Sequence, residues 1–163
     1  MTALGWLSRG RFTARVDADK VKQAIQAAER QTSGEIVVSV SRFFWGSVQK
    51  AADLTFVRLN VQRTEAHNGV LIFVVPARRQ FVLLGDQGIH AKVGQAFWDA
   101  AAEAIASRFR AGDVTGALVD GIERIGAQLA THFPYQGERD VNELPDDIDF
   151  ARGGRADGPR KTP

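Results

Sequence analysis

An aspartate lies between two glycines at the point where a strand-like run gives way to a helix-like one. Residues 78–94 read RRQFVLLGDQGIHAKVG, and Asp86 is the acidic residue of the GDQG segment. An aspartate in this position can cap the turn and the helix that follows it. It can equally supply a carboxylate to a metal ion or to a reaction. The spacing alone leaves both readings open.

Other polar residues that precede apolar runs could join Asp86. Glu35 comes directly before one run, and His67 and Asn68 stand before the next. Carboxylate and amide oxygens suit a hard divalent cation such as Ca²⁺ or Mg²⁺. We therefore expect a metal site formed by Glu35, Asn68 and Asp86, with Ca²⁺ as the expected ion. Asp86 and Glu35 are also the candidates for a catalytic role. The alternatives are a surface ion pair for Glu35 and a plain loop position for His67.

The elements that must position these residues follow from the hydrophobic pattern. Apolar runs predict strands at 35–45, 69–75 and 79–85, and helical periodicity covers 16–34, 47–63, 90–112 and 113–133. A helix joins the first two strands, so they are expected to be parallel, and the tight PAR turn makes the third antiparallel. The sequence thus predicts an α/β protein, a three-layer α/β/α sandwich with a small mixed sheet. The polar positions above then meet at one edge of that sheet.

Two groups of residues could bind an anion. The third predicted helix begins close to Gly88, so the backbone N–H groups of Gly88 and Ile89 are candidates for binding phosphate. Arg42, Arg78 and Arg79 gather at the opposite edge of the sheet, where an anionic partner could dock. The alternative is a solvated arginine cluster without a ligand.

Local signals also predict how the helices end and pack. Asp17 or Asp19 is expected to cap the first helix, and Gly34 to close it in the left-handed conformation. Three glycines at positions 116, 121 and 126 interrupt the last helix and are expected to permit close helix packing.

Several well-known catalytic patterns are absent from the sequence. It contains no cysteine, no HExxH, no GxSxG, no GxGxxG after a strand and no P-loop. Thiolate chemistry is therefore excluded, and zinc-hydrolase, serine-hydrolase and nucleotide-binding functions have no support. Whether the protein is an enzyme stays open.

Charge and hydropathy indicate which kinds of partner to expect. A net charge of +2 over 163 residues gives no reason to expect nucleic acid. The first residues do not have the order of a secretory signal, and no run is long enough for a transmembrane helix, so we expect a cytoplasmic protein. An unknown protein partner could contact the aromatic run 43–45. Weak peripheral membrane contact is an alternative role for the N-terminal residues Leu4, Trp6, Leu7 and Phe12 with Arg9, Arg11 and Arg15.

Composition divides the chain into three parts. Residues 1–16 are expected to be an arm that packs on the body as a strand or extended segment, and residues 17–135 form the α/β/α domain. Residues 136–163 are an acidic linker followed by a basic tail rich in Gly and Pro, which we expect to be disordered.

The order and spacing of several segments resemble the TPM domain family. The segments are TSGEIVVSV at 32–40, HNGVLIFVVPARRQFVLLGDQGI at 67–89, FW at 97–98, FRAGD at 109–113 and a GI..IG..L..HFP pattern that ends at Pro134. The resemblance covers roughly residues 17–134 and implies an α/β/α sandwich. It also implies either acid phosphatase activity, as described for some plant members, or calcium binding near an acidic cluster. The family pattern carries over onto Glu35, Asp86, Asn68 and Gly69.

The chain departs from the exported members of this family. Those members carry an Asp-rich loop before the first helix, whereas residues 1–16 contain no acidic residue. The sequence is therefore similar to the shorter, soluble, bacterial-like branch. Three functions follow as hypotheses: a non-catalytic module that binds a divalent cation or an anion, a metal-assisted phosphomonoesterase, and an ion-independent interaction domain. The first is the expected one, because fold alone says little about chemistry.

Overall fold

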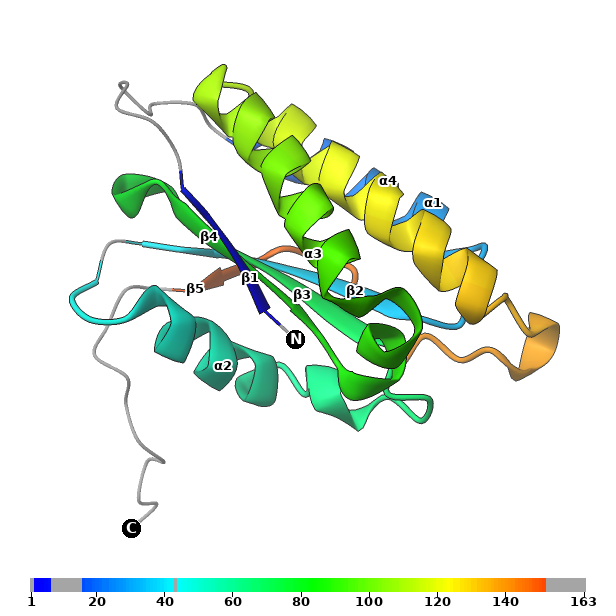
Figure 1. Ribbon diagram of the computed structural model, residues 1–163. Helices are drawn as coiled ribbons and strands as arrows, with labels where there is room; N and C mark the ends of the chain where they lie inside the picture. The colour runs from blue at the N-terminus through cyan, green and yellow to red at the C-terminus, as the bar shows by residue number, and fades with distance from the viewer. Residues whose placement is uncertain (1, 7–15, 43, 152–163) are drawn as a thin grey trace, which may run out of the picture.

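A five-stranded mixed sheet forms the centre of the protein. The computed structural model describes residues 2–6, 16–42 and 44–151. The strands lie in the order β1-β4-β3-β2-β5 (Figure 1). Their bounds are β1 Thr2–Trp6, β2 Glu35–Ser41, β3 Gly69–Val75, β4 Gln80–Gly85 and β5 Asp149–Ala151.

The three central strands pair as the sequence predicts. β2 and β3 are parallel, with Glu35 opposite Gly69. β3 and β4 are antiparallel, with Val70 opposite Gly85, and the short 3-10 helix η2 (Pro76–Arg78) joins them. The starts of β2 and β3 and the end of β4 therefore lie together at one end of the strands. This is the edge of the sheet at which the polar residues were expected to meet.

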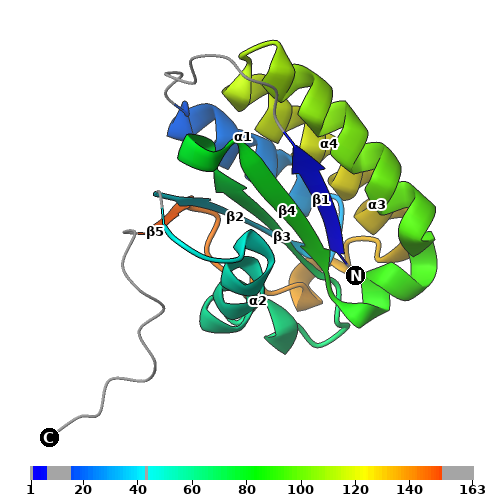
Figure 2. The same cartoon turned by 60° about the vertical axis from the view of Figure 1, so that its left-hand side comes forward.

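Helices cover both faces of this sheet. Helices α1 (Ala18–Glu29), α3 (Gln87–Arg110) and α4 (Val114–His132) lie on one face, and α2 (Val48–Arg58) lies on the other (Figures 1 and 2). The expected α/β/α sandwich is confirmed. Within the described part of the chain, no helix has the length and apolar character that crossing a bilayer requires.

The central strands are buried on both faces, which explains their continuous apolar runs. Ile36 and Ile72 belong to the core beneath α1, α3 and α4, whereas Val37 and Phe73 belong to the core beneath α2. Each such side chain contributes roughly 1.5–3 kcal/mol when fully buried. Successive side chains of β2 therefore pack alternately into two cores, and this alternation fixes the register of the strand.

The sheet has two further strands at its edges, of which β1 lies in the arm expected to pack on the body as a strand or extended segment, and β5 was not predicted. β1, the described part of the N-terminal arm, pairs with β4. β5 pairs with β2 in parallel, so the acidic segment expected to be a linker contributes a strand to the domain. β5 has three residues, and a polar contact fixes it: Asp149 accepts hydrogen bonds from Ser39 and Arg58. Of the tail expected to be disordered, residues 151–163, Ala151 belongs to β5, and residues 152–163 lie outside the described residues.

The helix ends follow the predicted caps with one exception. Asp17 accepts the backbone N–H of Lys20 and caps α1 as expected. The expected left-handed role of Gly34 is wrong, because α1 ends earlier and its C-cap, Arg30, is right-handed. Gly34 instead permits close packing, since a Cβ there would lie 2.6 Å from a methyl group of Leu129.

Two of the three glycines in α4 have the expected packing role. A Cβ at Gly126 would lie 2.8 Å from the Cβ of Ala28 in α1, and one at Gly121 would lie 2.7 Å from Ile105 in α3. Gly116 differs, because its N–H donates to Asp113, which caps α4. Glycine thus brings α4 close to both neighbouring helices.

Candidate functional site

Asp86 is the N-cap of α3. One carboxylate oxygen, Oδ1, accepts the backbone N–H of Gln87 at 2.7 Å. The other, Oδ2, lies 3.0 Å from Nδ1 of His67, whose side chain is half exposed. The capping alternative is therefore confirmed for Asp86, and both of its oxygens already have partners.

The start of α3 packs tightly against the loop before β3. The N–H of Ile89 donates to the carbonyl oxygen of His67 at 3.2 Å. A Cβ at Gly88 would come within 2.4 Å of the carbonyl oxygen of Ala66. The structure thus places the expected anion position, Gly88 and Ile89, against two backbone carbonyls.

Asn68 is buried between the same loop and the turn after α1. Its backbone N–H donates to Thr64 Oγ1, and its Nδ2 donates to Ser33 Oγ at 3.5 Å. Its Oδ1 finds no hydrogen-bond donor in the described part of the chain. Asn68 therefore retains one acceptor, although a hydrogen bond holds its side chain.

The structure brings the backbones of the three expected metal ligands to one edge. Glu35 lies opposite Gly69, and the N–H of Asp86 donates to the carbonyl oxygen of Gly69 at 2.9 Å. Their side chains have separate partners, however. Asp86 engages His67 and α3, whereas Glu35 engages a segment near the C-terminus. Glu35 and Asp86 therefore belong to two different clusters of side chains.

Glu35 holds a buried carboxyl at the first position of β2. Its side chain is 4% exposed, and Oε1 accepts the backbone N–H of Glu143 at 2.8 Å. Oε2 finds no partner among the described residues. Burial raises the pKa of Glu35 to about 7, and the charges of Glu143 and Asp146 add to the increase. The protein therefore keeps one buried carboxylate oxygen without a donor.

Glu29 places a second carboxyl beside the first. It is the last residue of α1, and its Oε1 accepts the backbone N–H of Ile36 at 3.0 Å. Burial raises the pKa of Glu29 to about 9, and the charges of Glu35 and Asp146 increase it further. Two carboxyl groups that each resist ionisation thus lie on either side of the turn between α1 and β2.

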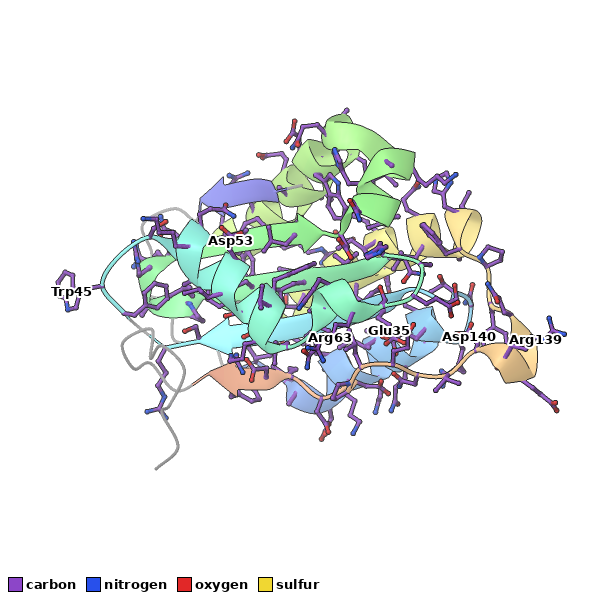
Figure 3. All side chains as sticks on the ribbon, turned by 90° about the horizontal axis from the view of Figure 1, so that it is seen from below. Glu35, Trp45, Asp53, Arg63, Arg139 and Asp140 are labelled. Carbon is purple, nitrogen blue, oxygen red and sulfur yellow. The ribbon has the colours of Figure 1, made fainter. Side chains whose placement is uncertain are left out.

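A pocket of about 360 Å³ opens beside these two carboxyl groups. One wall is the end of α1 and the turn into β2, and the other is the segment after α4, seen near Glu35 and Asp140 in Figure 3. Its lining contains four carboxylates and one arginine: Glu29, Glu35, Asp140, Asp146 and Arg30. The remaining lining residues are Gln26, Thr32, Gly34, Tyr135 and Asn142. We call this the acidic pocket.

The segment that forms the second wall, residues 135–148, is held at both ends. The N–H of Tyr135 donates to the carbonyl oxygen of Gln31, and Lys22 forms an ion pair of 2.7 Å with Asp147. Leu144, between these points, is buried in the core beneath α2, and Ile148, directly after Asp147, is buried in the core on the opposite face of the sheet. The segment therefore crosses the edge of the sheet and closes one side of the acidic pocket.

The oxygen chemistry of the acidic pocket fits a hard divalent cation. Four of its lining side chains are carboxyl groups, and the unpartnered Oε2 of Glu35 is available to a cation. No three His, Cys, Asp or Glu side chains of the described residues are already arranged as a metal centre. A cation would therefore have to draw the carboxylates together as it displaces their protons.

The arginines expected at the opposite edge do lie at that end of the sheet. Arg42 follows β2 and is exposed, and Arg79 precedes β4. Arg78 donates to the carbonyl oxygen of Gly46 and lies 5.3 Å from the ring centre of Phe44. Phe43, the first residue of the aromatic run 43–45, lies outside the described residues.

Sequence reasoning missed Glu29 and Asp146. The position of Glu29 near the end of a predicted helix gives no indication of a site, and Asp146 belongs to a segment interpreted as a linker. The only signal was the density of acidic residues in 138–149, ERDVNELPDDID, which indicates charge but not its destination.

Comparison with known proteins identifies relatives of the whole domain. The TPM domain family matches residues 10–128. The solution structure of the BA42 protein from the psychrophilic bacterium Bizionia argentinensis is similar, with 36% sequence identity and a TM-score of 0.77. That similarity covers 86% of this chain and 99% of BA42. A search of curated proteins finds no match.

Proposed function

Since the chain belongs to the TPM domain family, we propose that it is a non-catalytic binding module that takes a divalent cation, calcium first, in the acidic pocket. The Oε2 of Glu35 carries this proposal. A carboxylate oxygen that is buried without a donor is costly. A cation that reached it from the open side of the pocket would remove that cost.

The charge of the acidic pocket favours a cation over an anion. Its lining holds four carboxylates and only Arg30 as a cation. An anion would meet repulsion from Glu35 and Asp146, whereas a cation would offset the burial, and the added repulsion, that raise both glutamate pKa values. The raised pKa values support this assignment, because they measure how poorly the protein alone stabilises these charges.

The spread of the carboxylates favours calcium over magnesium. Ca²⁺ accepts six to eight oxygens in flexible geometry, roughly 2.3–2.6 Å away, while Mg²⁺ demands a near-ideal octahedron. The carboxylates come from α1, β2 and the segment 135–148, and Asn142 adds an amide oxygen. Such dispersed ligands suit the larger ion, and its binding would tie residues 135–148 more firmly to the sheet.

Thermal unfolding with added CaCl₂ or MgCl₂ tests this function. Calcium is expected to raise the melting temperature of the wild-type protein by mass action. Glu35→Gln keeps the acceptor for the Glu143 N–H but removes the charge, so the calcium-dependent increase should disappear. Asp86→Asn is the matched control, because it removes one carboxylate charge at the neighbouring edge and should keep the increase.

Two results would count against the acidic pocket. A calcium-dependent increase in melting temperature that persists in Glu35→Gln but is lost in Asp86→Asn would place the metal site beside Asn68 and Asp86 instead. The absence of any increase with either ion in the wild-type protein would remove the cation-binding function altogether.

Metal-assisted phosphatase activity is the second candidate and depends on the first. The ion would polarise a phosphoryl oxygen and activate water. Release of phosphate from a phosphomonoester is therefore worth measuring only in the ion that stabilises the fold. Activity that needs calcium and is lost in Glu35→Gln would change the assignment from binding module to enzyme.

A further inference from the structure

The end of the sheet opposite the acidic pocket combines an exposed tryptophan with several cations. It contains the loop after β2, the start of α2 and the η2 turn. We define the basic end by Arg42, Trp45, Lys50, Arg78 and Arg79. We propose that the basic end docks the protein on an anionic lipid membrane, with Trp45 at the point of contact. This inference goes beyond cation binding and involves no residue of the acidic pocket.

Trp45 stands out from the surface at this end. Its side chain is 90% exposed and points away from the body at the tip of the loop (Figure 3). Tryptophan side chains are usually largely buried in soluble domains. At a bilayer surface, by contrast, the indole ring is favoured at the level of the lipid headgroups. The exposure of Trp45 therefore matches a membrane-facing position.

Arg78 holds in place the loop that carries Trp45. Arg78 donates to the carbonyl oxygen of Gly46 and, at 3.5 Å, to that of Phe44. The guanidinium of Arg78 also lies over the ring of Phe44, which packs against the core beneath α2. Gly46 supplies the positive φ of 115° that the loop requires. These contacts fix the loop while Trp45 itself remains exposed.

The four cations around Trp45 have no carboxylate partner among the described residues, although Arg78 also holds the loop. Arg42 and Lys50 are exposed, and Arg78 and Arg79 are half-buried. Within the described part of the chain, none of the four forms a salt bridge. The nearby carboxylates of α2 and β5 have other partners, since Asp53 bonds Gln49 and Asp149 bonds Arg58.

Charge is therefore separated along the sheet. The acidic pocket lies at the start of β2, and the basic end lies where β2 finishes. A protein with this separation orients with its positive end toward a negatively charged surface. Juxtamembrane Lys and Arg residues gain attraction from anionic lipids within about one Debye length.

Two described strands finish at the basic end, and the sequence that follows each of them is rich in cations. Residues 7–15 continue from Trp6, which pairs with Gln80 beside Arg79, and contain three arginines and no acid. Residues 152–163 continue from Ala151, which pairs with Ser41 beside Arg42, and contain four cations and one acid. Both segments thus join the domain at the basic end.

An exposed indole among cations fits lipid better than nucleic acid. The ring would enter the headgroup region while the cations meet lipid phosphates, which is the arrangement of interfacial anchors. Nucleic acid would bind through the same cations, so the test compares the binding of duplex DNA with the binding of anionic vesicles.

Vesicle binding by the full chain tests the proposal. Vesicles of phosphatidylglycerol mixed with phosphatidylcholine should sediment with the protein and shift its tryptophan emission to the blue, and pure phosphatidylcholine vesicles should do neither. Trp45→Ser should abolish the emission shift and weaken binding at least several-fold. Val141→Ser removes another exposed apolar side chain, 70% exposed, far from the basic end, and should behave like the wild-type protein.

Charge reversal provides the matched control. Arg42→Glu/Lys50→Glu should reduce binding at least tenfold, whereas Arg63→Glu/Arg139→Glu, with the same change in net charge on exposed residues elsewhere (Figure 3), should retain it. Circular dichroism confirms that each variant is folded. Equal loss in both double variants, no binding by the wild-type protein, an emission shift that persists in Trp45→Ser, or tighter binding of duplex DNA than of anionic vesicles would overturn the proposal.

Discussion

The carboxyl of Glu29 reaches across the turn between α1 and β2 and accepts the N–H of Ile36, the residue that follows Glu35. This contact places two acidic side chains beside each other at one wall of the acidic pocket. Burial raises the pKa of both groups, and the charge of Glu35 adds to the increase for Glu29. The stability of the protein should therefore depend on pH in a way that can be measured.

Stability should fall as pH rises from about 5 to about 9. The two glutamates have pKa values of about 7 and about 9 in the folded protein, above the ordinary 4.5. A raised acid pKa means that the folded state holds its proton longer than the unfolded state. The stabilisation is complete below about 4.5 and is lost as pH rises through the folded pKa values. We expect the free energy of unfolding to fall by an amount on the order of 3 kcal/mol. This figure already allows for solvent screening in the open pocket.

Urea unfolding at several pH values measures this slope. Glu29→Gln/Glu35→Gln should flatten it between pH 5 and 9, because neither amide titrates. A slope that is unchanged in this double variant would show that other groups cause it.

Removing the Asp86 cap should destabilise α3 without affecting calcium binding. Asp86→Ala loses the acceptor for the Gln87 N–H and the contact with His67, with an expected cost of about 1 kcal/mol. Asp86→Asn keeps a capping oxygen and should cost less. Chemical denaturation compares the two, and a cost for Asn as large as that for Ala would indicate that charge, rather than capping, is what matters at this position.

Gly88 should tolerate no side chain. A Cβ there would lie 2.4 Å from the carbonyl oxygen of Ala66 and 2.5 Å from that of His67, and neither backbone can yield cheaply. Gly88→Ala should therefore destabilise the protein by more than about 2 kcal/mol, despite the better helix propensity of alanine. Gln87→Ala, on the exposed neighbour, should change stability by less than about 0.5 kcal/mol. Equal effects of the two would refute the close approach.

Asp149 should hold β5 on the sheet. It accepts hydrogen bonds from Ser39 and Arg58, which outweigh its burial and keep its pKa below the ordinary value. Asp149→Ala should cost about 1–3 kcal/mol and increase amide exchange in residues 149–151. Exchange in α4 should stay slow. Rapid exchange throughout the protein would show instead that β5 supports the whole fold.

The central architecture could be predicted because local pattern and tertiary structure agree there. The apolar runs of β2, β3 and β4 require burial on both faces, and the short turn at η2 permits only a hairpin. β5 could not be predicted in this way, because three residues carry no periodicity. Its position depends on Asp149 meeting Ser39 and Arg58, which are distant in sequence.

The candidate site was predictable only in part, for a similar reason. Glu35 and Asp86 were identified by their place at the ends of strands, and their backbones do lie at one edge. Their side chains separate because Asp86 caps a helix while Glu35 turns toward the segment 135–148. Glu29 lies beside Glu35 because its carboxyl accepts the N–H of Ile36 across the turn, and the sequence of a helix end does not show this contact. Asp146 joins them only after the segment 135–148 folds back across the sheet, and no local sequence signal predicts that fold.

The amide resonances of the wild-type protein during a calcium titration test the central claim most directly. Ile36 and Glu143 donate their N–H groups to Glu29 and Glu35, so their amides report the state of both carboxyls. Binding in the acidic pocket predicts that these two amides shift most, and that Glu35→Gln abolishes the shift. The largest shifts at Gln87 and His67, or no shifts at all, would contradict it.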